Sequence, residues 1–202
     1  MRIGLLGPAL GDEAALWDAV EFLLGDAGVD QAIYLGEDED TIERVMHAWA
    51  REIFGGEPGQ DAFLERAVQL ARAGTAEQIE ELLSAEASLR RLAAIRKLPP
   101  SPARAVEMIA DRIVIAVHDK SILDEEDIAN AALIVYGKSD KAELRRFGTR
   151  YFLTPGPAAD GRVAVLEVEE DGGVSIALFE TSGLPVLREK MARRTAKMNV
   201  AR

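Results

Sequence analysis

The stretch RIGLLGPALGDEAALWDAVEFLLGDAGVDQAIYL, residues 2–35, predicts a strand, a helix and a second strand. Its beginning, residues 2–7, is apolar and ends in glycine, which is typical of a short buried strand. Over residues 12–25 the apolar side chains recur every three or four positions, as on one face of a helix. Residues 31–35 form the second strand. A strand, a helix and a strand in this order indicate parallel pairing with a right-handed crossover.

Three helices are expected in the segment that follows, about 40–96, which forms an insertion after the second strand. The first begins near Asp40 and ends where glycine and proline cluster. The second covers about 61–73. The third opens with the capping box Thr75-Ala76-Glu77-Gln78 and is expected to run to about residue 96. One face of the first helix carries an apolar stripe, which consists of Ile42, Val45, Met46, Trp49, Ile53 and Phe54.

Strands return in the C-terminal half of the chain. Ser101-Pro102 has the form of an N-cap followed by proline, so a short helix is expected over about 102–110. The expected strands cover 112–117, 132–136, 151–154, 162–168 and 174–180, with a short helix at 124–131. These elements predict one mixed α/β domain over residues 1–202, a β-sandwich flanked by helices that carries the helical insertion.

The composition is that of an ordinary globular protein, with 48% apolar and 29% charged residues among 202. A net charge of −11 argues against a general binder of nucleic acid or of anionic membranes. Because the chain has no cysteine, it has neither disulfides nor a thiolate metal site. It shows no signal-peptide pattern at its N-terminus and no apolar run long enough for a membrane span, so a cytoplasmic protein is expected.

Positive charge collects in a basic tail, residues 186–202 (VLREKMARRTAKMNVAR). This segment holds six Lys/Arg and one Glu, a balance of +5, so the remainder carries −16. One interpretation is a solvated C-terminal helix. The other is a docking segment, with Arg193 and Arg194 as candidate contacts, for an acidic partner or for the protein's own acidic body.

Several common catalytic motifs are missing. The sequence has no G-x-x-x-x-G-K-[ST], no G-x-G-x-x-G and no G-x-S-x-G, so it lacks the usual phosphate-binding loops and the nucleophile elbow. Its two histidines, His47 and His118, lie far apart in the sequence. An acid–base design that relies on paired histidines is therefore excluded.

Five short stretches at the expected strand ends form a pattern of their own: residues 1–11, 33–38 (IYLGED), 113–120 (IVIAVHDK), 134–140 (IVYGKSD) and 152–157 (FLTPGP). In order and spacing they resemble the motif segments of the calcineurin-like metallophosphoesterases, specifically their small phosphodiesterase branch. The resemblance covers about 1–38 and 110–185 and lapses in the insertion. It implies a β-sandwich flanked by helices, with a binuclear metal site that activates water for phosphodiester hydrolysis.

Most of the ligands that the resemblance implies are replaced. Pro8 stands at the position of the first aspartate and Leu10 at that of the following histidine, and neither side chain can coordinate a metal. Glu37 replaces the bridging aspartate and keeps its charge. The Gly-His-x-His motif is replaced by residues 137–140, in which Lys138 introduces a cation and Asp140 a carboxylate. No Gly-Asn-x-Asp occurs between residues 40 and 110.

His118 is the one residue that matches a family ligand, although a hydrogen-bonded structural histidine is the alternative. The four carboxylates of residues 37–40 can equally form a solvated loop that favours the next helix N-terminus. What remains of the motifs is mainly glycine and proline that shape the backbone: Gly7, Gly11, Gly36, Gly137, Pro155 and Gly156. The pattern therefore predicts a retained fold without metal catalysis, and no cofactor is expected.

The leading hypothesis is a catalytically inactive phosphoesterase-like protein that serves as an interaction or regulatory scaffold. The phosphoesterase-like subunit of the retromer coat is a precedent for this use of the fold. A protein partner or a second copy of the chain is expected, with no nucleic acid. The candidate contacts are the apolar stripe named above, whose alternative role is core packing, together with Arg193 and Arg194.

Two other functions stay open. The vacated cleft could bind a phosphate or a nucleotide without hydrolysing it, through Lys138, Ser139 and His118, although the nearby acidic residues disfavour an anion. A residual phosphodiesterase with one metal would instead need a different donor set, namely Glu37, Asp38, His118 and Asp140.

Overall fold

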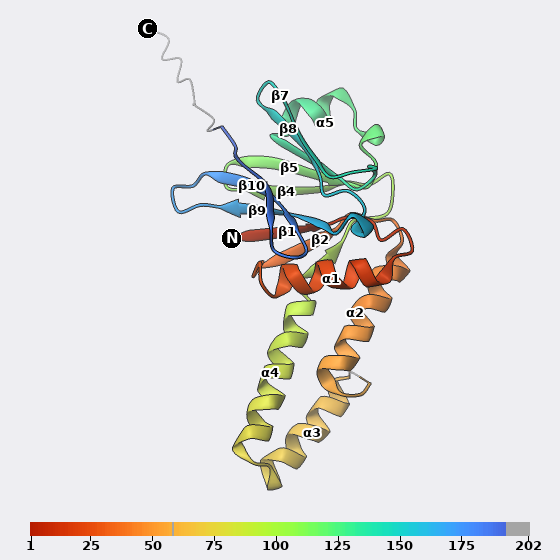
Figure 1. Ribbon diagram of the computed structural model, residues 1–202, viewed down its shortest axis with the longest axis vertical. Coiled ribbons are helices and arrows are strands. Elements are labelled where there is room, and N and C mark those ends of the chain that lie inside the picture. The colour runs from red at the N-terminus through yellow and green to blue at the C-terminus, as the bar shows by residue number, and fades with distance from the viewer. Residues whose placement is uncertain (58, 193–202) are drawn as a thin grey trace.

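The chain folds into two stacked β-sheets with helices on their outer faces and a helical arm that projects away from them (Figure 1). The computed structural model describes residues 1–57 and 59–192. The predicted class, a mixed α/β sandwich flanked by helices, is confirmed. Among the residues described, no helix combines the length and the apolar character that a membrane crossing requires.

The first sheet contains the predicted strand–helix–strand unit at its centre. Strand β1 (Arg2–Leu6) pairs in parallel with β2 (Gln31–Tyr34), and helix α1 (Glu13–Leu24) crosses between them. Asp12 caps α1, since its carboxylate accepts a hydrogen bond of 3.0 Å from the Ala15 N–H. The other strands are β3 (Ile95–Lys97), β9 (Arg162–Val168), β10 (Val174–Glu180) and β11 (Pro185–Lys190), in the order β11-β10-β9-β1-β2-β3.

The second sheet has the order β4-β5-β6-β8-β7. Its strands are β4 (Ala105–Ile109), β5 (Arg112–Val117), β6 (Leu133–Tyr136), β7 (Glu143–Phe147) and β8 (Arg150–Thr154). Strands β5, β6 and β8 run parallel, so their carboxyl ends meet at one edge. Helix α5 (Glu125–Asn130) and the short 3₁₀ turn Lys120–Ile122 complete this half, while a second 3₁₀ turn, Ala158–Asp160, packs against α1 and β9 of the first.

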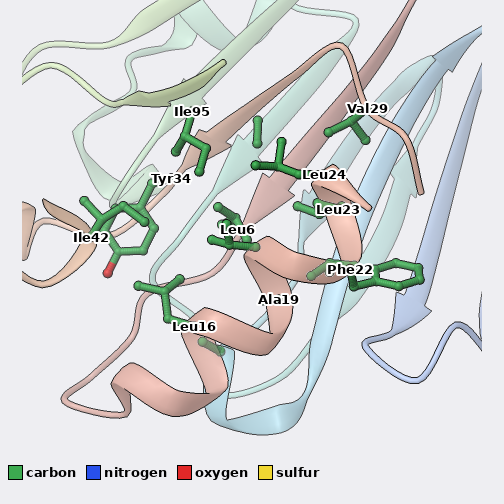
Figure 2. Packing of buried hydrophobic residues seen from close by; sticks show 14 of the residues in the cluster. Leu6, Leu16, Ala19, Phe22, Leu23, Leu24, Val29, Tyr34, Ile42 and Ile95 are labelled. Atoms are coloured by element: carbon green, nitrogen blue, oxygen red, sulfur yellow. The ribbon is translucent and has the colours of Figure 1, made fainter. Parts of the chain in front are cut away.

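The core has three layers. Between α1 and the first sheet lie Leu6, Leu16, Ala19, Leu23 and Tyr34, all at most 1% exposed (Figure 2). A second layer fills the space between the two sheets. A third lies on the outer face of the second sheet, where Ile115, Val117 and Ile134 pack with residues of α5 and its flanking turns. The central strands, such as β1, β5 and β6, are thus buried on both faces, while the edge strands β7 and β11 stay largely exposed.

The helical arm consists of α2 (Glu39–Phe54), α3 (Gln60–Ala73) and α4 (Ala76–Leu92). Helix α4 begins with the predicted capping box, in which the Thr75 hydroxyl accepts from the Gln78 N–H and the Gln78 side chain accepts from the Thr75 N–H. Figure 1 shows α2 and α4 joining the arm to the sheet layer and α3 at its far end.

Two predictions near the end of the insertion are wrong, namely the end of α4 and the short helix that was expected to follow. Helix α4 was expected to continue to residue 96 but ends at Leu92, and Ile95–Lys97 forms strand β3 beside β2. The segment 102–110 was expected to be helical, yet Ala105–Ile109 is strand β4, hydrogen-bonded to β5. Strand β3 pairs with β2, which lies far away in the sequence, whereas β4 forms a hairpin with the adjacent β5. In both segments, strand pairing outweighs the local helix signal.

The helix expected in the basic tail is also wrong where the structure describes it. Pro185–Lys190 is the edge strand β11, paired with β10. Arg188 lies 3.0 Å from Glu167 and Lys190 lies 3.0 Å from Asp171, so this part of the tail pairs with the protein's own acidic body. Arg193 and Arg194 lie outside the described residues. Strand β7 was not predicted, because its residues 143–147 (ELRRF) lack an apolar face.

Candidate functional site

The predicted motif stretches converge at the carboxyl ends of β1, β2, β5 and β6. The Lys138 N–H donates to the His118 carbonyl oxygen at 2.7 Å, which joins the ends of β6 and β5. The Ala158 N–H donates to the Pro8 oxygen at 2.9 Å, which joins the loop after β1 to the turn after β8. The backbone of the site is therefore assembled as the resemblance implies.

Glycines allow these loops to approach so closely. A Cβ atom on Gly7 would lie 1.7 Å from the Gly156 oxygen, and one on Gly137 would lie 2.1 Å from the Leu35 oxygen. Gly156 itself has φ +76°, a conformation that side chains rarely adopt. The retained glycines are thus needed for packing backbone against backbone around the site.

His118 is held in one orientation at the end of β5. Its Nδ1 lies 2.8 Å from the carbonyl oxygen of Leu35, and because a carbonyl can only accept, Nδ1 carries the proton. The other nitrogen, Nε2, lies 3.8 Å from a carboxylate oxygen of Glu37. This is the orientation in which histidines bind metals, with the distal nitrogen held by a carbonyl. The histidine is also half-buried and satisfied, as the structural alternative predicts.

A cation occupies the neighbouring position. The Lys138 ammonium donates to Oδ2 of Asp119 at 2.6 Å, while Oδ1 of Asp119 accepts from the Ser121 N–H at 2.9 Å. The hydrogen bond from Lys138, followed by that from Ser121, lowers the pKa of Asp119 to about 2. Asp119, and to a lesser extent Glu37, in turn raise the pKa of Lys138. Asp119 is therefore an ionised carboxylate that is already neutralised by a lysine.

The second acidic residue of the β2 loop is also engaged. Tyr34 is buried beneath the loop after β1, where its hydroxyl accepts from the Ala9 N–H at 3.0 Å and donates to Asp38. Burial, and then the bond to Asp38, raise the pKa of Tyr34 above its ordinary value. The hydroxyl thus ties together the two loops that would carry the first metal ligands.

The other predicted positions do not enter the site. Leu10 has φ +50° and is 72% exposed, so its side chain faces solvent. Pro8 is buried and contributes only its backbone oxygen, and Asp140 is exposed. The site therefore brings together Glu37, His118, Asp119 and Lys138.

These groups do not fit a binuclear metal centre. Such a centre needs several anionic oxygens and imidazoles around each ion. Here one imidazole faces one free carboxylate, and the next carboxylate is bound by an ammonium group. Over residues 1–57 and 59–192, no three or more His, Asp or Glu side chains form a group that could hold a metal ion.

A small cleft of about 190 Å³ lies beside His118. Its polar wall carries Glu37 and Asp119, and its apolar wall carries Leu98 and Pro99. Pockets for drug-sized ligands have roughly 300–1,000 Å³, so this cleft is too small for a nucleotide. The carboxylate of Glu37 also disfavours a phosphate group, whereas the charge of Asp119 is balanced by Lys138. The remaining lining residues are Gly36, Pro100, Ser101, Ala103 and Ile122.

The apolar stripe of α2 packs inside the protein rather than on a free surface. Ile42 and Val45 are buried in the layer beneath α1, and Met46, Trp49 and Ile53 pack against it. The Trp17 and Trp49 rings lie 5.6 Å apart, and Phe54 is 7% exposed. The stripe therefore fills the base of the arm, which corrects its role as a contact surface in favour of core packing.

Two residues of the site were missed by the sequence analysis. Asp119 was passed over as the neighbour of His118, although a carboxylate directly after a buried strand is a usual signal of a site residue. Tyr34 was counted as part of a strand, and nothing local indicates that its hydroxyl reaches Ala9, 25 positions away.

We expect Lys138→Ala to raise the pKa of Asp119 from about 2 towards its ordinary value of 3.8. The folded-state pKa is the lower one, so this carboxylate stabilises the fold above about pH 4, and the contribution is lost as pH falls from 3.8 to about 2. Carboxyl-carbon NMR titration measures the pKa directly, with Lys138→Arg as the control that keeps the cation. A wild-type pKa near 3.8 would show that the ion pair does not form.

No protein-family model matches the sequence, and no curated protein sequence matches it either. Solved structures do match. Vps29 from Chaetomium thermophilum aligns over 100% of both chains with a TM-score of 0.56 at 10% identity. A predicted phosphoesterase from Streptococcus pneumoniae aligns over 95% of this chain and 97% of its own, with a TM-score of 0.52 at 14% identity.

An archaeal phosphodiesterase aligns over 89% of this chain and 100% of its own, with a TM-score of 0.50 at 14% identity. At such identities the likeness concerns the fold alone. The chain has the calcineurin-like metallophosphoesterase fold that its motif spacing predicted.

Proposed function

We propose that this protein is a catalytically inactive member of the phosphoesterase-like fold that acts through protein–protein contacts, as an interaction or regulatory scaffold. One observation carries the proposal: the Lys138 ammonium, 2.6 Å from Asp119, stands where the implied site needs an imidazole ligand. A protonated lysine has no lone pair to offer a metal ion, and its ion pair occupies the carboxylate of Asp119, so neither group is available as a ligand. The same fold occurs in an archaeal phosphodiesterase and in Vps29, so the fold by itself does not decide activity.

The replacements remove side chains that would bind a metal and leave the backbone-shaping residues in place. The glycines that shape the site are kept under strict steric demand, as Gly7 and Gly137 show. The donors that would hold metal are replaced or already paired. A protein that preserves a scaffold while losing its ligands is better explained by binding than by catalysis. The two alternatives are weaker, since the cleft is small for a nucleotide and carries the carboxylate of Glu37, and four donors for one metal do not converge.

The test is a titration with Mn²⁺ followed by thermal unfolding and by hydrolysis of bis-p-nitrophenyl phosphate. We expect no saturable rise in Tm and no turnover above the rate in buffer. A metal-dependent phosphodiesterase in the same buffer serves as the positive control. Stabilisation together with turnover, both abolished in Glu37→Ala and in His118→Ala, would make the protein an enzyme with an unusual ligand set.

Inorganic phosphate tests the ligand-sensor alternative in the same material. Calorimetric titration with phosphate should show no binding to the wild type that is absent from Lys138→Ala. If phosphate raises Tm in the wild type but not in Lys138→Ala, the cleft is a phosphate site and the scaffold proposal loses its basis.

A further inference from the structure

The distal part of the helical arm exposes four large apolar side chains on helices that have little packing of their own. Helix α3 contains 14 residues and none of them is buried. Helices of this length are marginal in water unless tertiary packing supports them. On its exposed side Leu64 is 52% and Val68 49% exposed. The end of the arm therefore lacks the packing that would hold α3 in place.

Helix α4 adds two further apolar side chains, Ile79 at 39% and Leu83 at 59% exposure. Its buried residue in this region is Leu82, and in α3 Phe63 and Ala67 are half-buried, so we assign these three positions to the inward sides of the two helices. Leu64, Val68 and Leu83 each follow an inward position by one residue, which is a rotation of about 100°. Because the helices run antiparallel, equal rotations in α3 and α4 carry these side chains to the same side of the hairpin. We call Leu64, Val68, Ile79 and Leu83 the tip face.

The opposite side of the hairpin has a different character. There Arg66 of α3 and Glu81, Ser84, Ala85 and Ser88 of α4 line an open hollow of about 580 Å³, which the end of α2 closes with residues 52–55. Arg66 and Glu81 each precede an inward position by one residue, so their side chains point about 100° in the opposite direction, away from the tip face. Polar groups thus line one side of the hairpin and apolar side chains the other, which is the pattern of a helix pair with a partner on one side.

The charges at the helix ends indicate which partner fits. Helix α3 has Asp61 in its first turn and Arg72 in its last. When α3 lies antiparallel to its own copy, the acidic end of each helix meets the basic end of the other. A parallel arrangement would place like charges together, which is unfavourable. The tip of the arm is therefore complementary in charge to itself turned by 180°.

We infer that two copies of this protein associate through their tip faces, with α3 and α4 of each arm antiparallel to those of the other in a four-helix layer. Figure 1 shows the arm projecting well clear of the sheets, so two arms can overlap tip to base while the two sandwiches stay at opposite ends. A two-fold interface of this kind uses the same patch on both subunits. The inference does not depend on the cleft being inactive, since the tip face lies on different elements.

The mass of the full chain in solution tests the inference, by light scattering after size exclusion and by sedimentation over a range of concentrations. We expect a dimer for the wild type. Val68→Glu and Leu83→Glu should each weaken the dimer by about tenfold or more, since they place charge in a buried interface. Leu184→Glu is the matched control, because Leu184 is equally exposed, at 62%, but precedes strand β11. Circular dichroism shows that each variant is folded.

A charge exchange tests the antiparallel arrangement. Asp61→Arg alone and Arg72→Asp alone should each weaken the dimer, because each brings like charges together across the interface. The double variant with both changes should restore it. A wild type that stays monomeric at every concentration, or a dimer that tolerates Leu83→Glu, would overturn the inference. A dimer that the double variant fails to restore would overturn the antiparallel arrangement.

Discussion

Replacing Gly7 with alanine should destabilise the protein by about 3 kcal/mol or more, which for a chain of this size lowers Tm by roughly 10 °C. The new Cβ would lie 1.7 Å from the Gly156 oxygen and 2.9 Å from its carbonyl carbon. Both are backbone atoms, and Gly156 is constrained by its φ of +76° and by the nearby Ala142 N–H. Neither loop can move aside without breaking the packing at the carboxyl end of β1. Urea unfolding followed by circular dichroism measures the loss.

Gly56→Ala provides the control for the Gly7 variant. No atom lies within 4 Å of a Cβ built on Gly56, which is located between α2 and α3. This change should alter the free energy of unfolding by no more than about 0.5 kcal/mol. If Gly7→Ala unfolds at the same urea concentration as the wild type, the loop after β1 and the turn after β8 do not make the close approach described.

Leu23→Ala should cost about 2–5 kcal/mol, the range for truncating a fully buried leucine. Leu23 is 0% exposed and lies in the layer between α1 and the first sheet (Figure 2). Its side chain covers Gly4, since a Cβ on Gly4 would lie 2.8 Å from Leu23 Cδ1. Removing it leaves a cavity that the glycine beneath cannot fill. The measurement is again urea unfolding, with the exposed Leu184→Ala as the control that should change little.

A double-mutant cycle sharpens this prediction. Gly4→Ala should destabilise the wild type, because its Cβ meets the Leu23 side chain, and should do so less when residue 23 is already alanine. Additive effects of the two changes would show that Leu23 does not pack on Gly4.

Much of the fold follows from local signals. The strand–helix–strand unit at the N-terminus is visible in its apolar periodicity, and the capping box at Thr75 places the start of α4 correctly. The absence of metal-ligand chemistry at Pro8 and Leu10 is likewise a property of the residues themselves, because neither side chain has a donor atom wherever the fold places it. Apolar periodicity and helix capping involve only a few neighbouring residues, and side-chain chemistry only one. These signals can therefore be recognised in the sequence without the tertiary structure.

The strands at the sheet edges could not be predicted in this way. Ile95–Lys97, Ala105–Ile109 and Pro185–Lys190 carry helix-like or tail-like sequences, and each becomes a strand because a partner strand offers free backbone groups. β-structure depends on cross-strand neighbours more than on intrinsic preference. The apolar stripe of α2 shows the same dependence, since its periodicity predicted an apolar face without saying what covers it.

The candidate site also combines features that the sequence shows with features that only the tertiary structure shows. The sequence by itself determined which residues stand at the positions where the resemblance implies ligands, which of them are glycines and where the motif segments lie in the chain. Only the tertiary structure decided that Lys138 pairs with Asp119, that Tyr34 joins the loops at Ala9 and Asp38, and that the tip face lies on one side of the arm. The physical reason is distance along the chain. Chemical identity belongs to each residue alone, whereas pairing and exposure depend on groups that folding brings together from far away.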